Sequence, residues 1–134
     1  MAIDYGEKRI GLAVSDPTRT IASPAGFIAR RAGKRPPVAR ILRCAEELGA
    51  SELVLGLPLD ENGNETARSE EVREVARQIG LRAGLPVRLV DERYSTASAL
   101  RAVREMGGST RGRKGDVDAI AATILLQHAL KVAL

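Results

Sequence analysis

The sequence predicts a single α/β domain, residues 1–134, built on a mixed five-stranded sheet with helices on its faces. The chain has 134 residues, of which 44% are hydrophobic, and this length suits one folded core. The N-terminal part carries short apolar runs separated by turn signals, which favours antiparallel strands. The later part alternates helical and strand patterns, which favours parallel pairing. The expected sheet therefore has three antiparallel strands followed by two parallel ones.

The first three strands are expected within the opening 30 residues. Segments 1–5 and 9–16 are apolar and are joined by a short polar connection, the pattern of a β-hairpin. Segment 20–30 predicts a third strand, which Pro24 and Gly26 should bend or confine to an edge of the sheet.

Helices and strands then alternate to the end of the chain. The predicted elements are a helix carrying Val38 to Leu48, a strand over 53–57, a helix carrying Val72 to Ala83, a strand over 87–92, a helix carrying Ala99 to Met106, and a last helix from about Val117 to Val132. The continuous apolar run at 53–57 is typical of an interior strand that is covered on both faces. The glycine-rich segment 107–115 predicts a basic loop, and Asp116 is expected to cap the last helix.

Composition narrows the class of protein and its partners. The formal net charge is +4, which suits a polyanion such as RNA or branched DNA. Aromatic residues are only 2% of the chain, too few for a platform that stacks single-stranded bases, so charge on the nucleic-acid backbone should dominate binding. No apolar run reaches the roughly 20 residues of a membrane span, so a cytoplasmic protein with no membrane partner is expected. No dimer surface is evident, and the expected state is a monomer or a weak homodimer.

Three acidic residues are candidates for a catalytic site. Asp4 falls within the apolar first strand, where a buried carboxylate is costly unless it is paired or bound to a cation. Glu92 ends a predicted parallel strand, and ligands bind at the carboxyl ends of strands in open α/β sheets. Strand alternation puts the neighbouring Asp91 on the opposite face. Asp118 lies in the first turn of the last helix, beside the stripe that must face the sheet.

Each acid alone also has a structural interpretation. Asp4 could accept hydrogen bonds from the turn that follows its strand, and Asp118 could simply complement the helix dipole. Together, three converging carboxylates would repel one another unless a cation neutralised them. Oxygen ligands favour Mg²⁺ or Mn²⁺, while the single cysteine, Cys44, and the remote His128 disfavour zinc. The sequence therefore predicts Asp4, Glu92 and Asp118 as metal ligands and catalytic residues.

Basic residues accompany the acids along the chain and could hold nucleic-acid phosphates. Such runs more often form a solvated surface, so they support this role only together with the acids. The candidate nucleic-acid-binding residues are Lys8, Arg9, Arg30, Arg31, Lys34, Arg35, Arg111, Arg113 and Lys114.

Four segments of the chain resemble, in order and spacing, the YqgF/RuvX family: IDYGEKRIGLAVSD, LVLGLPLDENGNET, VDERYSTASA and KGDVDAIAATILLQ. The resemblance covers nearly the whole chain and implies an RNase H-like fold of the Holliday-junction-resolvase type. It also implies that Asp4, Glu92 and Asp118 are the metal ligands. Family members have several more residues before the first motif, whereas Met1 stands only three positions ahead of Asp4, so a short first strand is expected.

Three functions follow from these observations. The leading one is a metal-dependent nuclease that acts on structured nucleic acid. The resemblance implies two substrates, the end of pre-16S ribosomal RNA and the Holliday junction, and the lack of an evident dimer surface favours the RNA. The alternative is a non-catalytic nucleic-acid-binding module in transcription or ribosome assembly. A third interpretation takes the glycine turn of DYGEKRIG as the phosphate loop of a sugar kinase or actin-like ATPase. Chain length disfavours it, because those proteins hold nucleotide between two such domains and this chain has room for one.

Overall fold

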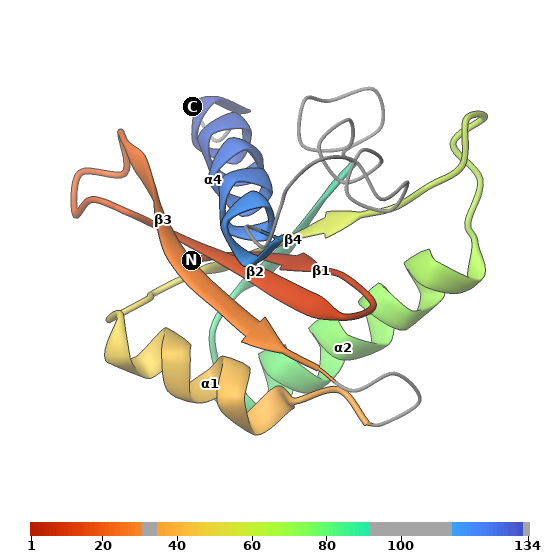
Figure 1. Cartoon of the computed structure of the whole chain (residues 1–134), viewed down its shortest axis with the longest axis horizontal. Helices are drawn as coiled ribbons and strands as arrows, with labels where there is room; N and C mark the ends of the chain where they lie inside the picture. The colour runs from red at the N-terminus through yellow and green to blue at the C-terminus, as the bar shows by residue number, and fades with distance from the viewer. Residues whose placement is uncertain (31–34, 92–113, 133–134) are drawn as a thin grey trace.

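The computed structural model describes residues 1–30, 35–91 and 114–132, which form a sheet with helices on both faces (Figure 1). The elements, in chain order, are β1 (Ala2–Tyr5), β2 (Arg9–Ser15), β3 (Ala22–Ala29), α1 (Val38–Glu47), β4 (Leu53–Leu57), α2 (Ala67–Ala83), β5 (Val87–Asp91) and α4 (Lys114–Val132). The predicted helix carrying Ala99 to Met106 lies outside the described residues.

The sheet has the predicted topology, with strand order β3-β2-β1-β4-β5. The pairs β1–β2 and β2–β3 are antiparallel, and the pairs β1–β4 and β4–β5 are parallel. Every residue of β4 is buried, as its continuous apolar run predicts for an interior strand. The short first strand is also held firmly, because all of β1 pairs with β2 while Ala2 and Ile3 pair with β4.

Two hydrophobic clusters cover the two faces of the sheet. The larger cluster joins α1 and α2 to strand residues such as Ile3, Leu12 and Leu55. The smaller one joins α4 to Ala2, Ala13 and Val54. In Figure 1, α4 lies on one side of the sheet, and α1 and α2 lie on the other. Small side chains on the α4 face let this helix pack close to the strands.

Two local features differ from a regular sheet or from the prediction. The β2–β3 register shifts between Gly11 and Ala13, and Gly26 adopts φ +89°, which is the bend expected in this edge strand.

Helix α4 begins at Lys114, so the prediction that Asp116 precedes and caps the helix is wrong, as is the predicted loop over residues 114–115. Glycine is better tolerated in a first turn than in a helix interior, since the first backbone N–H groups have no intrahelical partner there.

None of the helices in the described ranges is both long enough and apolar enough to span a membrane.

Candidate active site

Asp4 and Asp118 are the two buried carboxylates of the described chain. Their exposed fractions are 1% and 0%, and Ser69 is the other polar side chain buried among the described residues. An ionised group taken this far out of water requires charge compensation or hydrogen bonds. Their burial therefore points to a specific role for both aspartates.

Strand alternation explains why Asp4 faces α4. Ile3 and Tyr5 point into the cluster beneath α1 and α2, whereas Ala2 packs against α4. Successive side chains alternate between faces, so Asp4 shares the α4 face with Ala2. Asp4 pairs across the β1–β2 ladder with Gly11, which therefore lies on the same face.

Gly11 brings Asp118 to this position. A Cβ atom built on Gly11 would stand 2.0 Å from the backbone oxygen of Asp118 and 2.4 Å from its carbonyl carbon. Only a residue without a side chain permits this contact, because real Cβ atoms do not approach backbone atoms so closely. The backbones that carry Asp4 and Asp118 are therefore both neighbours of one glycine.

Arg9, from the same strand as Gly11, contacts Asp118. Its Nε donates a hydrogen bond to Asp118 Oδ2 at 2.9 Å, and the pair forms a salt bridge. Arg9 and Gly11 are two residues apart on β2, so they share the α4 face. The side chain of Arg9 is 21% exposed, whereas that of Asp118 is fully buried. The sequence indicated a phosphate-binding role for Arg9 and gave no sign of this ion pair.

The remaining basic candidates fall into different environments. Lys8 and Arg35 are exposed, as expected of phosphate-binding residues. Lys114 is the first residue of α4, and its side chain is not among those described. Four further candidates lie outside the described residues: Arg31, Lys34, Arg111 and Arg113.

Arg30 has internal contacts instead of a free guanidinium. Its guanidinium carbon lies 4.5 Å from the centre of the Tyr5 ring. Its nitrogens donate to the Gly6 carbonyl at 2.9 Å and to Glu71 Oε1 at 3.1 Å, and its side chain is only 10% exposed. Burial of Tyr5 raises the pKa of its hydroxyl to about 12, with the Arg30 charge opposing the shift. These contacts argue against phosphate binding by Arg30 and favour a structural role.

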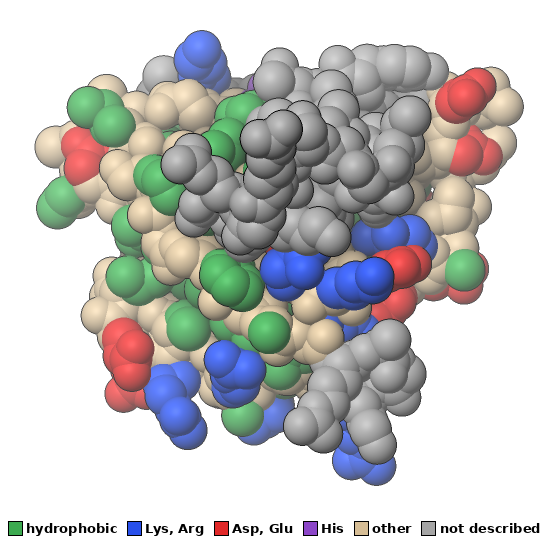
Figure 2. All heavy atoms as spheres, in the orientation of Figure 1, with side chains coloured by type: hydrophobic (Ala, Val, Ile, Leu, Met, Phe, Trp, Pro, Cys, Tyr) green, Lys and Arg blue, Asp and Glu red, His purple; other side chains and the backbone are tan. Residues whose placement is uncertain are grey.

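Arg68 is a basic residue near the site that the sequence did not single out. It projects from α2, donates to the Tyr5 carbonyl at 3.4 Å and forms an ion pair with Glu7 at 3.7 Å. Figure 2 shows Lys and Arg side chains gathered at the end of the sheet where β1 turns into β2. No local pattern could reveal this, because α2 and the β1–β2 turn meet only in the folded chain.

Comparison with known families identifies the chain. A family model described as "RuvX: Holliday junction resolvase" matches residues 1–132. The chain belongs to the RuvX family. This confirms the resemblance found in the sequence motifs.

Curated relatives cover nearly all of this RuvX-family chain. A protein of Clavibacter michiganensis subsp. michiganensis named "Putative pre-16S rRNA nuclease" is 45% identical over 131 residues, which are 98% of this chain and 81% of the relative. A protein of Nocardioides sp. with the same name is 42% identical over 97% of this chain and 85% of its own length.

Solved structures confirm the RNase H-like fold. The structure titled "Thermus thermophilus RuvC structure" superposes with a TM-score of 0.57 at 17% identity, and covers 98% of this chain and 93% of its own. The complex titled "T. thermophilus RuvC in complex with Holliday junction substrate" gives the same TM-score at 19% identity, over 98% and 92% of the two chains. At these identities the likeness concerns the fold alone.

In this RuvX-family chain, Glu92 is the next residue after the described strand β5. Within β5, Arg88 and Val90 face α4, because the Arg88 guanidinium donates to the Ala129 carbonyl at 2.9 Å and Val90 packs against the α4 cluster. Among the described residues, no three His, Cys, Asp or Glu side chains gather as a metal site. Glu92, the expected third carboxylate, is outside them, so its role stays a prediction.

The described residues of the acidic site fit a hard divalent cation. Asp4 and Asp118 supply carboxylate oxygens, which suit Mg²⁺ or Mn²⁺. Both are buried on one face of the sheet, where a cation would offset the cost of their charge. Asp118 already has a cationic partner in Arg9, which indicates that positive charge stabilises this position.

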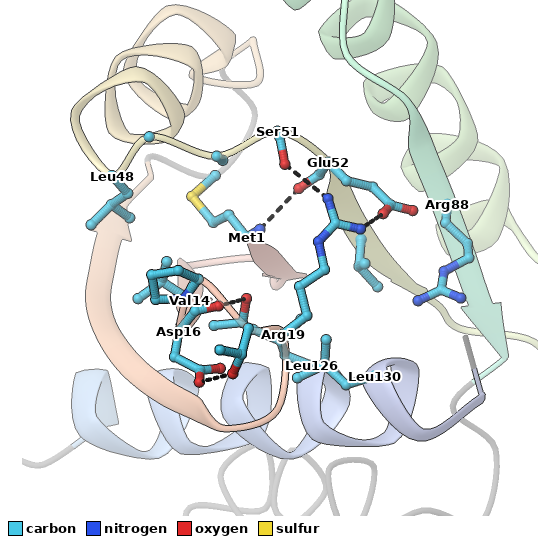
Figure 3. Close-up of a pocket in the computed structure, with 16 residues that line it drawn as sticks. Met1, Val14, Asp16, Arg19, Leu48, Ser51, Glu52, Arg88, Leu126 and Leu130 are labelled. Atoms are coloured by element: carbon cyan, nitrogen blue, oxygen red, sulfur yellow. Dashed lines mark hydrogen bonds and ion pairs between the residues drawn. The ribbon is translucent and has the colours of Figure 1, made fainter. Parts of the chain in front are cut away.

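A separate pocket of about 700 Å³ lies at the other end of the α4 face (Figure 3). It is lined by residues including Met1, Val14, Arg88 and Leu130, from the start of the chain, the end of β2, β5 and the C-terminal half of α4. Arg19 closes one side through hydrogen bonds to Ser51 at 2.9 Å and Glu52 at 3.0 Å. Neither Asp4 nor Asp118 lines it, so the pocket is distinct from the acidic site.

Proposed function

We propose that this chain is a metal-dependent nuclease that hydrolyses phosphodiester bonds in structured nucleic acid, with the end of pre-16S rRNA as its substrate. The observation that carries the proposal is that two buried aspartates, Asp4 and Asp118, are both backbone neighbours of Gly11. Membership of the RuvX family supports nuclease chemistry. The names of the curated relatives favour the ribosomal RNA precursor over the four-way junction that the family description names.

Asp4, Glu92 and Asp118 would hold Mg²⁺ or Mn²⁺. When bound, the metal would supply an activated water and charge stabilisation for the leaving oxygen of the phosphodiester. The chain contributes the fixed geometry: Asp4 is held by a strand that pairs on both sides, and Asp118 by a helix packed on Gly11. Ala122, Leu125 and Ala129 of α4 pack against the sheet on the same face as the site.

Cations around the site would bind phosphates of the substrate. Lys8 is exposed in the β1–β2 turn, next to Arg9, and Arg68 approaches this turn from α2. Backbone contacts of this kind position a nucleic acid without reading its sequence. We therefore expect substrate choice to depend on the shape of the folded nucleic acid more than on its bases.

The proposal is tested by incubating the purified chain and Mg²⁺ with precursor 16S rRNA and with a synthetic four-way DNA junction. We expect cleavage of the RNA by the wild-type chain and loss of cleavage in Asp4→Asn and Asp118→Asn. A matched control is Glu47→Gln, which removes an exposed carboxylate from α1 and should leave cleavage unchanged. Undiminished cleavage by the Asp4→Asn variant would refute the assigned site.

Two other outcomes would contradict the proposal, and each would indicate a different function. Salt-sensitive binding of RNA without cleavage by the wild-type chain, in Mg²⁺ and in Mn²⁺, would indicate a non-catalytic binding module. Paired cuts in the junction, with a dimer in sedimentation at the same concentration, would indicate a resolvase, because symmetric cleavage needs two active sites. Our proposal expects a monomer or weak homodimer that acts in the cytoplasm.

A further inference from the structure

We propose that Arg9 is the counter-cation of the acidic site, which means that its positive charge balances the buried Asp118 carboxylate when no metal is bound. In this role Arg9 is a positioning residue for Asp118. Its charge also opposes the binding of a divalent cation at the same site. The inference rests on the proposed function, since it treats Asp118 as a metal ligand. It concerns a different property, namely how the protein stabilises the acidic site without metal and what this does to metal affinity.

The geometry of the pair supports this role. Arg9 Nε donates to Asp118 Oδ2 at 2.9 Å, and the carboxylate is fully buried while the arginine remains 21% exposed. This charge-assisted hydrogen bond ties the Asp118 side chain to β2 through one carboxylate oxygen. Arg9 also stands two residues from Gly11, the point where the backbone of Asp118 rests on β2. One short stretch of β2 therefore fixes both the backbone and the side chain of Asp118.

The negative charges of the two buried aspartates explain why a cation such as Arg9 stabilises this site. Asp4 and Asp118 are both buried on the α4 face, and like charges in a poorly solvated position raise each other's energy. Arg9 supplies one positive charge at that position whether or not a metal is bound. The fold should therefore be stable without metal, and a metal ion that binds beside Arg9 should experience its repulsion.

This account predicts the sign of the effect on metal affinity. If Arg9 only oriented Asp118, a neutral residue at position 9 would weaken metal binding, because the ligand would be less well ordered. If Arg9 is the counter-cation, the same change leaves the carboxylates short of positive charge, and the divalent cation should bind more tightly. The two roles therefore give opposite results in one titration.

The experiment compares the wild-type chain with Arg9→Gln, Arg9→Lys and Arg19→Gln. Arg19 is the matched control, because it also pairs with a carboxylate, Glu52 at 3.0 Å, but on the exposed surface away from the acidic site. Thermal unfolding is measured with and without MnCl₂, and Mn²⁺ binding is measured by calorimetry. Both readouts are independent of nuclease activity.

We expect Arg9→Gln to melt on the order of 10 °C lower than the wild-type chain without metal. We expect it to bind Mn²⁺ about tenfold more tightly and to recover most of the lost melting temperature when Mn²⁺ is added. Arg9→Lys keeps the charge and should resemble the wild-type chain in Mn²⁺ affinity. Arg19→Gln should match the wild-type chain in both measurements.

Equal or weaker Mn²⁺ binding by Arg9→Gln would overturn the inference. If Arg9→Gln does not fold alone, the double variant Arg9→Gln/Asp118→Asn is compared with Asp118→Asn, and equal melting temperatures are expected because the charge that Arg9 balances is gone. A further loss of stability in the double variant would contradict the account. If the wild-type chain binds Mn²⁺ and cleaves its substrate, and Arg9→Gln leaves the Mn²⁺ affinity unchanged, this inference alone is refuted. If neither the wild-type chain nor any variant binds Mn²⁺, the proposed function is refuted as well.

Discussion

Gly11 and Asp118 are in backbone contact, since a Cβ atom on Gly11 would stand only 2.0 Å from the Asp118 carbonyl oxygen. Gly11 is also the cross-strand partner of Asp4. The distance between the two buried aspartates therefore depends on a residue that has no chemistry of its own. The spacing of the site is set by how closely α4 can approach β2.

Replacing Gly11 with alanine should separate α4 from the sheet. The added methyl group would meet backbone atoms, which cannot rotate away, so we expect the free energy of unfolding to fall by about 3 kcal/mol or more. Cleavage should fall with it, because Asp118 moves relative to Asp4. The control is Gly80→Ala in α2, where the new Cβ would lie 3.3 Å from the Val87 side chain and 3.9 Å from the Leu85 carbonyl oxygen, with no backbone clash. Denaturant unfolding of both variants checks the prediction, and equal stability would contradict it.

The Asp4→Asn variant should lose catalytic activity but keep the stability of the fold. Asparagine has nearly the same shape as aspartate but carries no charge, so the stability of the metal-free protein should stay within about 1 kcal/mol of the wild-type value. Turnover in Mg²⁺ should fall at least about 100-fold, while RNA binding persists. Single-turnover cleavage and filter binding on the same preparation test this. Loss of binding in parallel with cleavage would indicate that Asp4 maintains the fold instead.

The raised pKa of the Tyr5 hydroxyl predicts that the folded protein loses stability at high pH. Burial raises the pKa of its hydroxyl from 10.0 to about 12, so the folded protein holds this proton more tightly than the unfolded chain does. The resulting stabilisation is complete below pH 10.0 and is lost as the pH rises through about 12. Denaturant unfolding across this range should show a steeper decline for the wild-type chain than for Tyr5→Phe. Parallel curves would contradict the prediction.

Arg30 and Lys8 should respond in opposite ways to alanine substitution. Arg30→Ala removes the contact with the Tyr5 ring and hydrogen bonds to Gly6 and Glu71, so we expect a loss of about 2 kcal/mol in stability. Its effect on nucleic-acid affinity should be small. Lys8→Ala should leave stability unchanged but reduce the salt dependence of RNA binding by about one charge. A reversed pattern would show that Arg30 reaches the phosphates.

Local patterns in the sequence predicted the sheet and the position of Asp4 in a buried strand. The apolar first strand surrounds Asp4 with buried residues, and the continuous apolar run of β4 makes β4 an interior strand. The approach of α4 to Gly11 and the pairing of Arg9 with Asp118 could not be predicted this way. Both join segments from opposite ends of the chain, and no local period reports on such contacts.

Side-chain direction limited the prediction of the basic residues. Arg30 and Lys8 look alike in the sequence, yet the first turns inward over Tyr5 and the second is exposed. Arg68 was overlooked because it is one of several charged residues on α2, and only the fold brings it to the β1–β2 turn. The start of α4 at Lys114 was missed because Gly115 and its neighbours have the composition of a loop.

Crystals of the wild-type chain soaked in Mn²⁺ and measured for anomalous scattering would test most directly whether the two aspartates share a metal. The account predicts an anomalous peak within about 2.1 Å of a carboxylate oxygen of both Asp4 and Asp118, and no peak in Asp118→Asn crystals treated in the same way. Manganese bound only elsewhere, with the two carboxylates facing separate surroundings, would contradict it.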